Sequence, residues 1–318
     1  MPYEPPFETT DEIANLALEI AELVGRLAPD SELSTSPVLH RKLRIQTIHS
    51  SLAIEQNTLT MDQVTAIVNG DRVLGPPDEI REVENARRAY DLLGELDPNS
   101  IDDLLRVHRI MMDGLRKDAG TFRTKNAGVY DKDKLIHAGT PANYVPEVMA
   151  DLFAWLRRTS LHPLLASCVF HYEFEFIHPF SDGNGRMGRL WHTLMLSRWR
   201  TMLAWLPVES MIRARQSGYY AALNESNAIG SATPFVAFML TAVRDAMAPF
   251  CTRETEADAL AARIMNHMEA YPASTVDEIA EVVGSSKRTL ERTIAALKRE
   301  GRVARIGSPR AGQWDVKR

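Results

Sequence analysis

Cysteine is scarce in this sequence, because only Cys168 and Cys251 occur among its 318 residues. Two cysteines exclude the dense disulfide framework of small secreted proteins and are typical of a reducing cytoplasm. The first twenty residues lack the basic segment and the apolar run of a secretory signal. No stretch approaches the ~20 uninterrupted apolar residues that cross a bilayer. These absences predict a cytoplasmic protein with no membrane contact.

A strong excess of charge of one sign is also missing. The chain has 37 lysines and arginines against 42 aspartates and glutamates, which gives a formal net charge of −5. This balance excludes a protein that coats nucleic acid or an anionic membrane with its whole surface. The hydrophobic content of 45% over 318 residues is enough for one large core and a smaller module.

What the sequence does contain is helical periodicity, which predicts a mainly α fold. The exception is the segment 120–146, which is rich in turn residues. Within it, Val129-Tyr130 and Leu135-Ile136 flank an Asp-Lys-Asp-Lys turn. This pattern predicts a small exposed β-hairpin, or flap, inserted in a helical body.

The end of the chain has a different pattern. Polar residues at 251–256 predict a linker, and three helical segments followed by a hairpin come after it. Three helices and a hairpin make the winged helix-turn-helix arrangement, in which the third helix is the recognition element. We therefore expect an N-terminal helical region at 1–75, a core at 76–250 and a winged-helix domain at 257–318.

The most informative segment runs from His178 to Arg189, where a loop of small residues leads into a helix predicted to begin near Arg186. Backbone amides at a helix N-terminus form a ready anion site. Three consecutive residues would supply them here: Gly183, Asn184 and Gly185. Arg186 and Arg189 follow within the first turn and can bracket phosphate oxygens.

Two further side chains complete this set. Asp182 precedes the glycines and suits Mg²⁺, which prefers one or two protein carboxylates together with phosphate oxygens. His178, followed by a proline, is the group that can take a proton near neutral pH. A base, a metal carboxylate, an anion site and an arginine pair indicate phosphoryl-group chemistry with a hydroxyl nucleophile.

Other interpretations of the segment fit less well. Gly183-x-Gly185-x-x-Gly188 matches the dinucleotide-binding fingerprint, but no buried strand precedes it and no strand–helix alternation surrounds it. A Walker loop would need Gly-Lys-Ser/Thr after the glycines, and this segment lacks it. A zinc site through His171 and His178 lacks i, i+4 spacing and a nearby third ligand. A simple turn with solvent-exposed arginines would not be expected to combine a base, a carboxylate, backbone amides and two arginines within twelve residues.

The segment resembles the Fic signature, His-x-Phe-x-Asp/Glu-Gly-Asn-Gly-Arg-x-x-Arg, with every specified position matched. The resemblance extends over most of residues 40–250, since Leu105-x-x-His108 and Gly120-Thr-Phe-Arg123 are similar to the helix and turn that precede the signature. It implies a Fic helical core that carries the β-hairpin flap.

This resemblance implies an adenylyltransferase that moves AMP from ATP to a Ser, Thr or Tyr hydroxyl of an unidentified target protein, or of the chain itself. His178 would be the general base and Asp182 the Mg²⁺ ligand. The implied nucleotide-binding residues are Gly183, Asn184, Gly185, Arg186, Met187, Gly188, Arg189, Tyr219 and Asn227. For Tyr219 and Asn227, a role in helix packing or capping stays open.

The flap has its own implied role. In the family it pairs with the backbone of the target as an added strand, which places the acceptor hydroxyl over the nucleotide. The candidate edge next to the nucleotide consists of Leu135, Ile136, His137 and Ala138.

The segment 49–57 resembles the inhibitory helix of the family, Ser/Thr-x-x-x-Glu-Gly/Asn, and its Ser51 and Glu55 match. Gln56 stands where the family prefers Gly or Asn, so we expect Asn57 to supply the left-handed helix end. The resemblance implies that Glu55 pairs with Arg189 and places negative charge where the triphosphate would lie. Because the same glutamate positions water for AMP removal in some relatives, de-AMPylation also stays open.

The last 34 residues are basic, with ten lysines and arginines against three acidic residues. Possible DNA contacts are Lys287, Arg288 and Arg292 on the third helix and Arg310 at the wing tip. Winged helices also serve as protein-docking and homodimer modules. An alternative function is therefore a DNA-binding transcriptional regulator whose Fic body senses nucleotide or modifies itself. The intact signature favours the enzyme.

Overall fold

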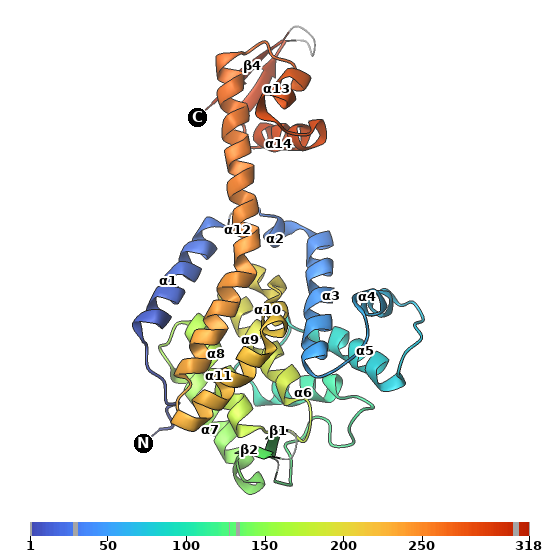
Figure 1. Cartoon of the computed structure of the whole chain (residues 1–318), viewed down its shortest axis with the longest axis vertical. Helices are drawn as coiled ribbons and strands as arrows, with labels where there is room; N and C mark the ends of the chain where they lie inside the picture. The colour runs from blue at the N-terminus through green and yellow to red at the C-terminus, as the bar shows by residue number, and fades with distance from the viewer. Residues whose placement is uncertain (1, 28–30, 127, 132–133, 308–311, 318) are drawn as a thin grey trace. The chain divides into compact units, whose positions relative to one another are not determined.

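The computed structural model describes residues 2–27, 31–126, 128–131, 134–307 and 312–317. The chain divides into two compact units, Met1–Ala248 and Pro249–Arg318 (Figure 1). Helices form nearly all of the regular structure in the first unit, which confirms the predicted mainly α fold. They are α1 Asp11–Arg26, α2 Glu32–Thr35, α3 Pro37–Ile54, α4 Met61–Asn69, α5 Pro77–Asp91, α6 Ile101–Met111, η1 Ala142–Tyr144, α7 Val145–Arg158, α8 Pro163–Ile177, α9 Asn184–Trp199, η2 Thr201–Trp205, α10 Val208–Ala214, α11 Gln216–Ile229 and the first part of α12 Thr233–Ala270.

Helices α8 and α9 form the centre of this unit and pack closely against each other. Both are buried nearly all round, because other parts of the unit pack on every face; α8 is largely apolar, whereas α9 also buries Arg189 and His192. Phe153 of α7 packs edge-on against Phe170 of α8 and Trp191 of α9, which locks the three helices together. The six-residue loop between α8 and α9 thus starts and ends in the most rigid part of the core.

The predicted flap is present as a two-stranded antiparallel hairpin of β1 Gly128–Asp131 and β2 Lys134–Ala138. Val129 pairs with His137, and the register shifts by one residue between Val129 and Tyr130. Turn-forming residues on both sides explain why strands interrupt the helices here.

The second unit contains the end of α12, then α13 Val276–Val283, α14 Lys287–Arg299, β3 Val303–Ile306 and β4 Gln313–Val316. Its core gathers Ile264, Met268, Ile279, Leu290 and Trp314. Helices and hairpin follow one another in the predicted order.

The predicted linker at 251–256 is wrong, because α12 continues through it from Thr233 to Ala270, past Pro249. The segment is polar, but it contains no glycine and its Arg and Glu residues are good helix formers. A polar composition suits an extended helix as well as a linker.

One helical window in the described part of the chain, Thr233–Cys251, is long and apolar enough to span a membrane. Half of it is buried within the protein, including Phe235, Val236, Met239 and Leu240. The apolar residues of this window thus belong to the core of the first unit.

Candidate active site

The loop between α8 and α9 begins with His178, which has a left-handed backbone (φ 53°). Such a conformation costs energy for a residue with a Cβ and needs support from its surroundings. Buried Arg123 supplies it, since its Nε donates to the His178 carbonyl at 2.7 Å and its backbone N–H to the Pro179 carbonyl at 2.9 Å. The predicted turn before the flap therefore holds the predicted base in place.

Two more side chains fix the rest of the loop. The buried Asn184 amide exchanges two hydrogen bonds with the Phe180 backbone, both of 2.9 Å. His108 stacks on Phe180 at 3.6 Å, and its Nδ1 accepts the Gly120 N–H at 2.8 Å. Its Nε2 therefore carries the proton that it donates to the Asp182 carbonyl at 3.1 Å. Burial lowers the pKa of His108 to about 4, which keeps this neutral pattern at physiological pH.

Helix α9 begins at Asn184, two residues before the predicted start. Its N-cap, Gly183, has φ 82°, and no side chain caps the helix. The Gly183 N–H donates to Asp182 Oδ1 at 2.6 Å, whereas the N–H groups of Asn184 and Gly185 have no partner within the described residues. The open helix N-terminus that the sequence predicts is thus formed, and it suits an anion.

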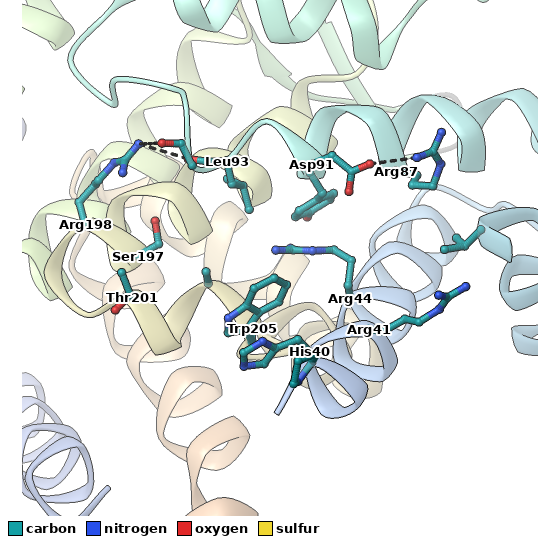
Figure 2. Close-up of a pocket in the computed structure, with 15 residues that line it drawn as sticks. His40, Arg41, Arg44, Arg87, Asp91, Leu93, Ser197, Arg198, Thr201 and Trp205 are labelled. Atoms are coloured by element: carbon teal, nitrogen blue, oxygen red, sulfur yellow. Dashed lines mark hydrogen bonds and ion pairs between the residues drawn. The ribbon is translucent and has the colours of Figure 1, made fainter. Parts of the chain in front are cut away.

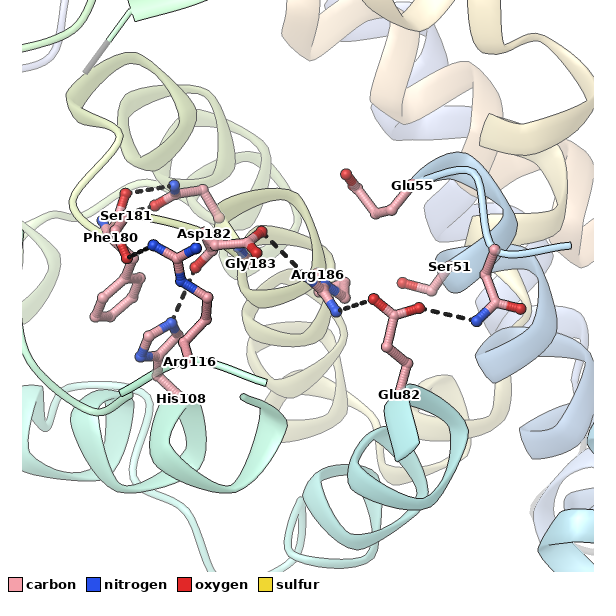
Figure 3. A network of polar contacts seen from close by, with 12 residues as sticks. Ser51, Glu55, Glu82, His108, Arg116, Phe180, Ser181, Asp182, Gly183 and Arg186 are labelled. Carbon is pink, nitrogen blue, oxygen red and sulfur yellow. Dashed lines mark hydrogen bonds and ion pairs between the residues drawn. The ribbon is translucent and has the colours of Figure 1, made fainter. Parts of the chain in front are cut away.

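Arg186 does not point freely toward solvent, as a phosphate clamp would. Its Nη1 donates to Glu82 Oε1 at 3.0 Å and its Nη2 to Asp182 Oδ1 at 3.2 Å (Figure 3). Glu82 Oε2 in turn accepts from Asn57 Nδ2 at 2.8 Å. This chain of contacts joins the anion loop to the segment that follows α3. Sequence analysis missed Glu82, because nothing in its local sequence distinguishes it from other surface acids of α5.

Arg189 is 1% exposed and pairs with α3. Its Nη2 donates to Glu55 Oε1 at 2.8 Å, and its Nε donates to Ser51 Oγ at 3.1 Å. Burial opposes ionisation of Glu55, but the charge and hydrogen bond of Arg189 outweigh burial and lower the pKa of that carboxyl. A Cβ on Gly185 would lie 2.3 Å from Glu55 Oε1. The carboxylate therefore sits against the N-terminus of α9.

The end of α3 differs from the prediction in one respect. The left-handed residue is Gln56, with φ 70°, and not Asn57. Asn57 instead donates its backbone N–H to the Leu52 carbonyl at 3.1 Å and its side chain to Glu82. The tertiary contact of Asn57 takes priority over its local preference for the left-handed region.

Gln56→Gly is expected to raise the free energy of unfolding by about 0.5–1 kcal/mol. Glycine removes the ~1–2 kcal/mol cost of a left-handed side-chain residue, and its greater freedom in the unfolded chain offsets part of that gain. Urea unfolding measures the difference. The matched control is Gln46→Gly inside α3, which should destabilise by ~1 kcal/mol. Destabilisation by both changes would contradict the strain at Gln56.

A cavity of about 210 Å³ lies beside this loop. It brings together residues from α3, α8, α9 and α11: Glu55, Glu175, Phe176, His178, Gly185, Arg189, Tyr219, Tyr220, Leu223, Asn224 and Asn227. Its volume is below the roughly 300–1,000 Å³ of common small-molecule sites. Glu55 is one of the residues that line this small space.

Tyr219 and Asn227 both line this cavity and also hold helices together. The Tyr219 hydroxyl lies 3.2 Å from His171 Nε2, and Asn227 Oδ1 accepts from the Tyr172 hydroxyl at 3.2 Å. Five other predicted nucleotide contacts do not line it: Gly183, Asn184, Arg186, Met187 and Gly188. Met187 is fully buried in the core, and a Cβ on Gly188 would lie 2.8 Å from Glu175 Oε1. The other lining residues of α11 are Tyr220, Leu223 and Asn224. Leu223 follows Tyr219, and Asn224 follows Tyr220, by four residues, so the helical spacing could have revealed them.

Glu175 is a cavity residue that sequence analysis missed. Its side chain is 11% exposed, and its Oε1 has no hydrogen-bond partner within the described residues. Burial raises the pKa of this carboxyl to about 8.

Glu175→Gln is expected to stabilise the protein at pH 9 but not at pH 5. Because the folded state holds this proton more tightly than the unfolded state, the free energy of unfolding falls as pH rises toward 8. Glutamine removes that dependence, and we expect a gain of about 1–3 kcal/mol at pH 9. Urea unfolding at both pH values measures it, with exposed Glu225→Gln as the control. An equal effect at both pH values would contradict the raised pKa.

The candidate contacts outside this cavity are placed as follows. Leu135, Ile136, His137 and Ala138 form strand β2 of the flap. Lys287, Arg288 and Arg292 are exposed on α14 of the second unit, and Lys287 pairs with Asp277 at 2.7 Å. Arg310 lies outside the described residues. The roles of these residues stay predictions.

Asp182 is the described residue that suits a magnesium ion at this site. The Asp182 side chain is 47% exposed, and its Oδ2 accepts no hydrogen bond from the described residues. No group of three or more metal-binding side chains occurs among those residues. A cation that takes one protein carboxylate and completes its shell with phosphate oxygens is of the Mg²⁺ type.

Comparison with known proteins agrees with this geometry. Residues 98–196 match the Fic/DOC family. A solved Fic family protein from Desulfovibrio desulfuricans G20 is 42% identical, covers 99% of this chain and 98% of its own, and superposes with a TM-score of 0.77. The solved Fic-1 fragment from Caenorhabditis elegans is 25% identical, with a TM-score of 0.61, and covers 77% of this chain and 72% of its own.

Among curated relatives, protein adenylyltransferase fic-1 of C. elegans is 33% identical over 227 residues. The match covers 66% of this chain but only 42% of that relative. The chain therefore spans less than half of the length of the curated enzyme that it resembles.

Proposed function

Because the chain belongs to the Fic family, we propose that it transfers AMP from ATP to a hydroxyl group of a protein. One observation carries the proposal: His178 and the uncapped N-terminus of α9 border the same cavity as Tyr219 and Asn227. A base, an anion site and a ring-lined pocket at one place are what transfer from a nucleotide requires. The curated relatives that the chain matches are adenylyltransferases by name.

The proposed reaction is a substitution at the α-phosphorus of ATP. His178 removes the proton of the acceptor hydroxyl, whose oxygen then bonds to the α-phosphorus of ATP. The bond from that phosphorus to the bridging oxygen breaks, and pyrophosphate leaves. The α9 amides stabilise the charge that develops on the phosphate oxygens. Asp182 would hold Mg²⁺, which when bound neutralises charge on those oxygens.

Glu55 is proposed to restrain this reaction. Its ionised carboxylate occupies the side of Arg189 that faces the cavity and lies against Gly185, where phosphate oxygens would otherwise bind. Negative charge at this place repels the triphosphate and removes a cation that would hold it. We propose that the productive position opens to ATP only when the Glu55–Arg189 pair separates.

Labelled ATP tests the transfer directly. The Glu55→Gly protein is incubated with Mg²⁺ and ATP that is labelled at either the α- or the γ-phosphate. We expect the α label to join the chain covalently with release of pyrophosphate, and the γ label not to join. Incorporation of the γ label would indicate phosphoryl transfer instead. Binding of ATP without incorporation of either label would contradict self-modification. If the bound AMP label is lost on incubation with the wild-type protein but not with the Glu55→Gly protein alone, the chain also catalyses de-AMPylation.

We also propose that the second unit contacts DNA. Arg288 and Arg292 lie one turn apart on the exposed side of α14, in a segment rich in positive charge. Charged contacts to phosphates release counterions, so affinity should fall steeply with salt. Changing both arginines to alanine should weaken binding to duplex DNA and lower the salt slope by about 2. Binding that ignores both changes would favour a protein-docking role.

A further inference from the structure

A second and larger cavity, of about 790 Å³, lies in the first unit and shares no residue with the cavity beside His178. It is formed by one face of α3, the end of α5, the end of α9 and η2 (Figure 2). Its lining combines apolar and ring-bearing residues with arginines: Pro37, His40, Arg41, Arg44, Val68, Arg87, Tyr90, Asp91, Leu93, Gly94, Ser197, Arg198, Thr201, Ala204 and Trp205. None of these positions belongs to the Fic signature.

Arg44 is the central feature of this cavity. Its side chain is only 9% exposed and extends from α3 toward Trp205 (Figure 2). The guanidinium lies 4.8 Å from the ring centres of both Tyr90 and Trp205. Its Nη1 is buried and has no hydrogen-bond partner within the described residues. A buried guanidinium group normally has a carboxylate or phosphate partner, because an unpaired buried charge is costly.

The charges of Glu209 and Asp91 act on Arg44, but among the described residues neither carboxylate forms an ion pair with it. Asp91 is the acidic residue among those that line the cavity, and it pairs with Arg87 at 3.0 Å. Buried Glu209 lies beyond Tyr90, whose hydroxyl donates to it at 3.0 Å. Burial raises the pKa of Glu209, which favours its neutral form. The lining of the cavity therefore has four arginines against one aspartate, beside apolar side chains such as Val68 and Leu93.

We propose that this cavity binds a small organic anion that has a flat apolar ring and a phosphate or carboxylate group. The anionic group would bond to the part of the Arg44 guanidinium that faces the cavity, with Arg41 adding charge. The ring would pack on Leu93 and Val68, because His40 and the Arg44 guanidinium already cover the Trp205 ring. An anion with an apolar ring would pair with the arginines and fill the apolar space together, which neither inorganic phosphate nor a neutral ring would do. The proposal does not depend on AMP transfer.

Isothermal titration with 1-naphthyl phosphate tests this site in the full-length protein. We expect one saturable site in wild type and at least tenfold weaker binding in Arg44→Met, because a charge-assisted pair is lost. The matched control, Arg26→Met on exposed α1, should bind as wild type does. Inorganic phosphate should bind more weakly than the naphthyl ester.

Two results would overturn the proposal: no saturable binding to wild type, or unchanged binding in folded Arg44→Met. Circular dichroism checks that Arg44→Met folds. If it does not, the double change Arg41→Ala and Arg87→Ala replaces it, because both side chains lie at the rim and only Arg87 makes an exposed ion pair. This variant should bind the ester several-fold more weakly, and unchanged binding would again contradict the site.

Discussion

Glu55→Gly is expected to raise kcat/KM for AMP transfer from ATP by about 10- to 100-fold. The proposed restraint makes the productive site of the wild type available only when the Glu55–Arg189 pair, at 2.8 Å, opens. The apparent affinity for ATP falls by the fraction of molecules that are open. An opening cost of about 1.4–2.8 kcal/mol corresponds to the expected range. Without the carboxylate, Arg189 keeps its hydrogen bonds to Ser51. The Nη2 hydrogen that bonds to Glu55 then becomes available to a phosphate oxygen.

Initial rates of α-label incorporation at several ATP concentrations measure this effect. Glu55→Gln should give an intermediate rate, because it removes the charge but keeps most of the volume. The control is Glu300→Gly, which changes another glutamate at a helix C-cap, in the second unit. It should leave the rate unchanged. A Glu55→Gly protein that is no faster than wild type would contradict restraint by Glu55.

His178→Ala, placed in the Glu55→Gly protein, is expected to lower the rate of AMP transfer by about 10²–10⁴-fold. Loss of a positioned general base has effects of this size. The affinity for ATP should change little, since Arg189 and the α9 amides remain. Both transfer rate and ATP binding must therefore be measured, because a collapsed loop would weaken binding as well.

The left-handed backbone at position 178 complicates this test, so a second variant is needed. His178→Asn keeps a residue type that tolerates φ 53° and still lacks a base. It should lose transfer to the same extent as alanine. The matched control is His267→Ala in the second unit, which should transfer AMP at the parent rate. Retained transfer in both His178 variants would show that another group removes the proton.

The sequence predicted the active-site loop well because its chemistry is local. The resemblance to the Fic signature indicated both the fold and the chain positions of His178 and Arg189. The comparison with a solved Fic protein confirms the family, and the structure places these residues around one cavity. The helix of Ser51 and Glu55 was also predicted, because its match to the inhibitory helix is short and continuous. Its contact with Arg189 is present.

Sequence analysis was less reliable where local preference competes with distant contacts. Asn57 was predicted as the left-handed helix end, but its side chain binds Glu82 and leaves that conformation to Gln56. Residues 251–256 were predicted as a linker, although their polar composition is equally compatible with the helix that they form. In both cases a one-dimensional pattern allowed two conformations, and the rest of the molecule selected one.

The amino-acid sequence by itself determined the mainly α fold, the flap and the signature loop, whereas the pairing of Glu55 with Arg189 was implied by the family resemblance. These features depend on periodicity, turn residues and a contiguous motif. Only the tertiary structure decided that Glu82 joins Arg186 to Asn57, that burial raises the pKa of Glu175, and that Arg44 lies at a second cavity between Tyr90 and Trp205. The physical reason is that partners, burial and cavity shape arise from residues far apart in the chain, which no local pattern specifies.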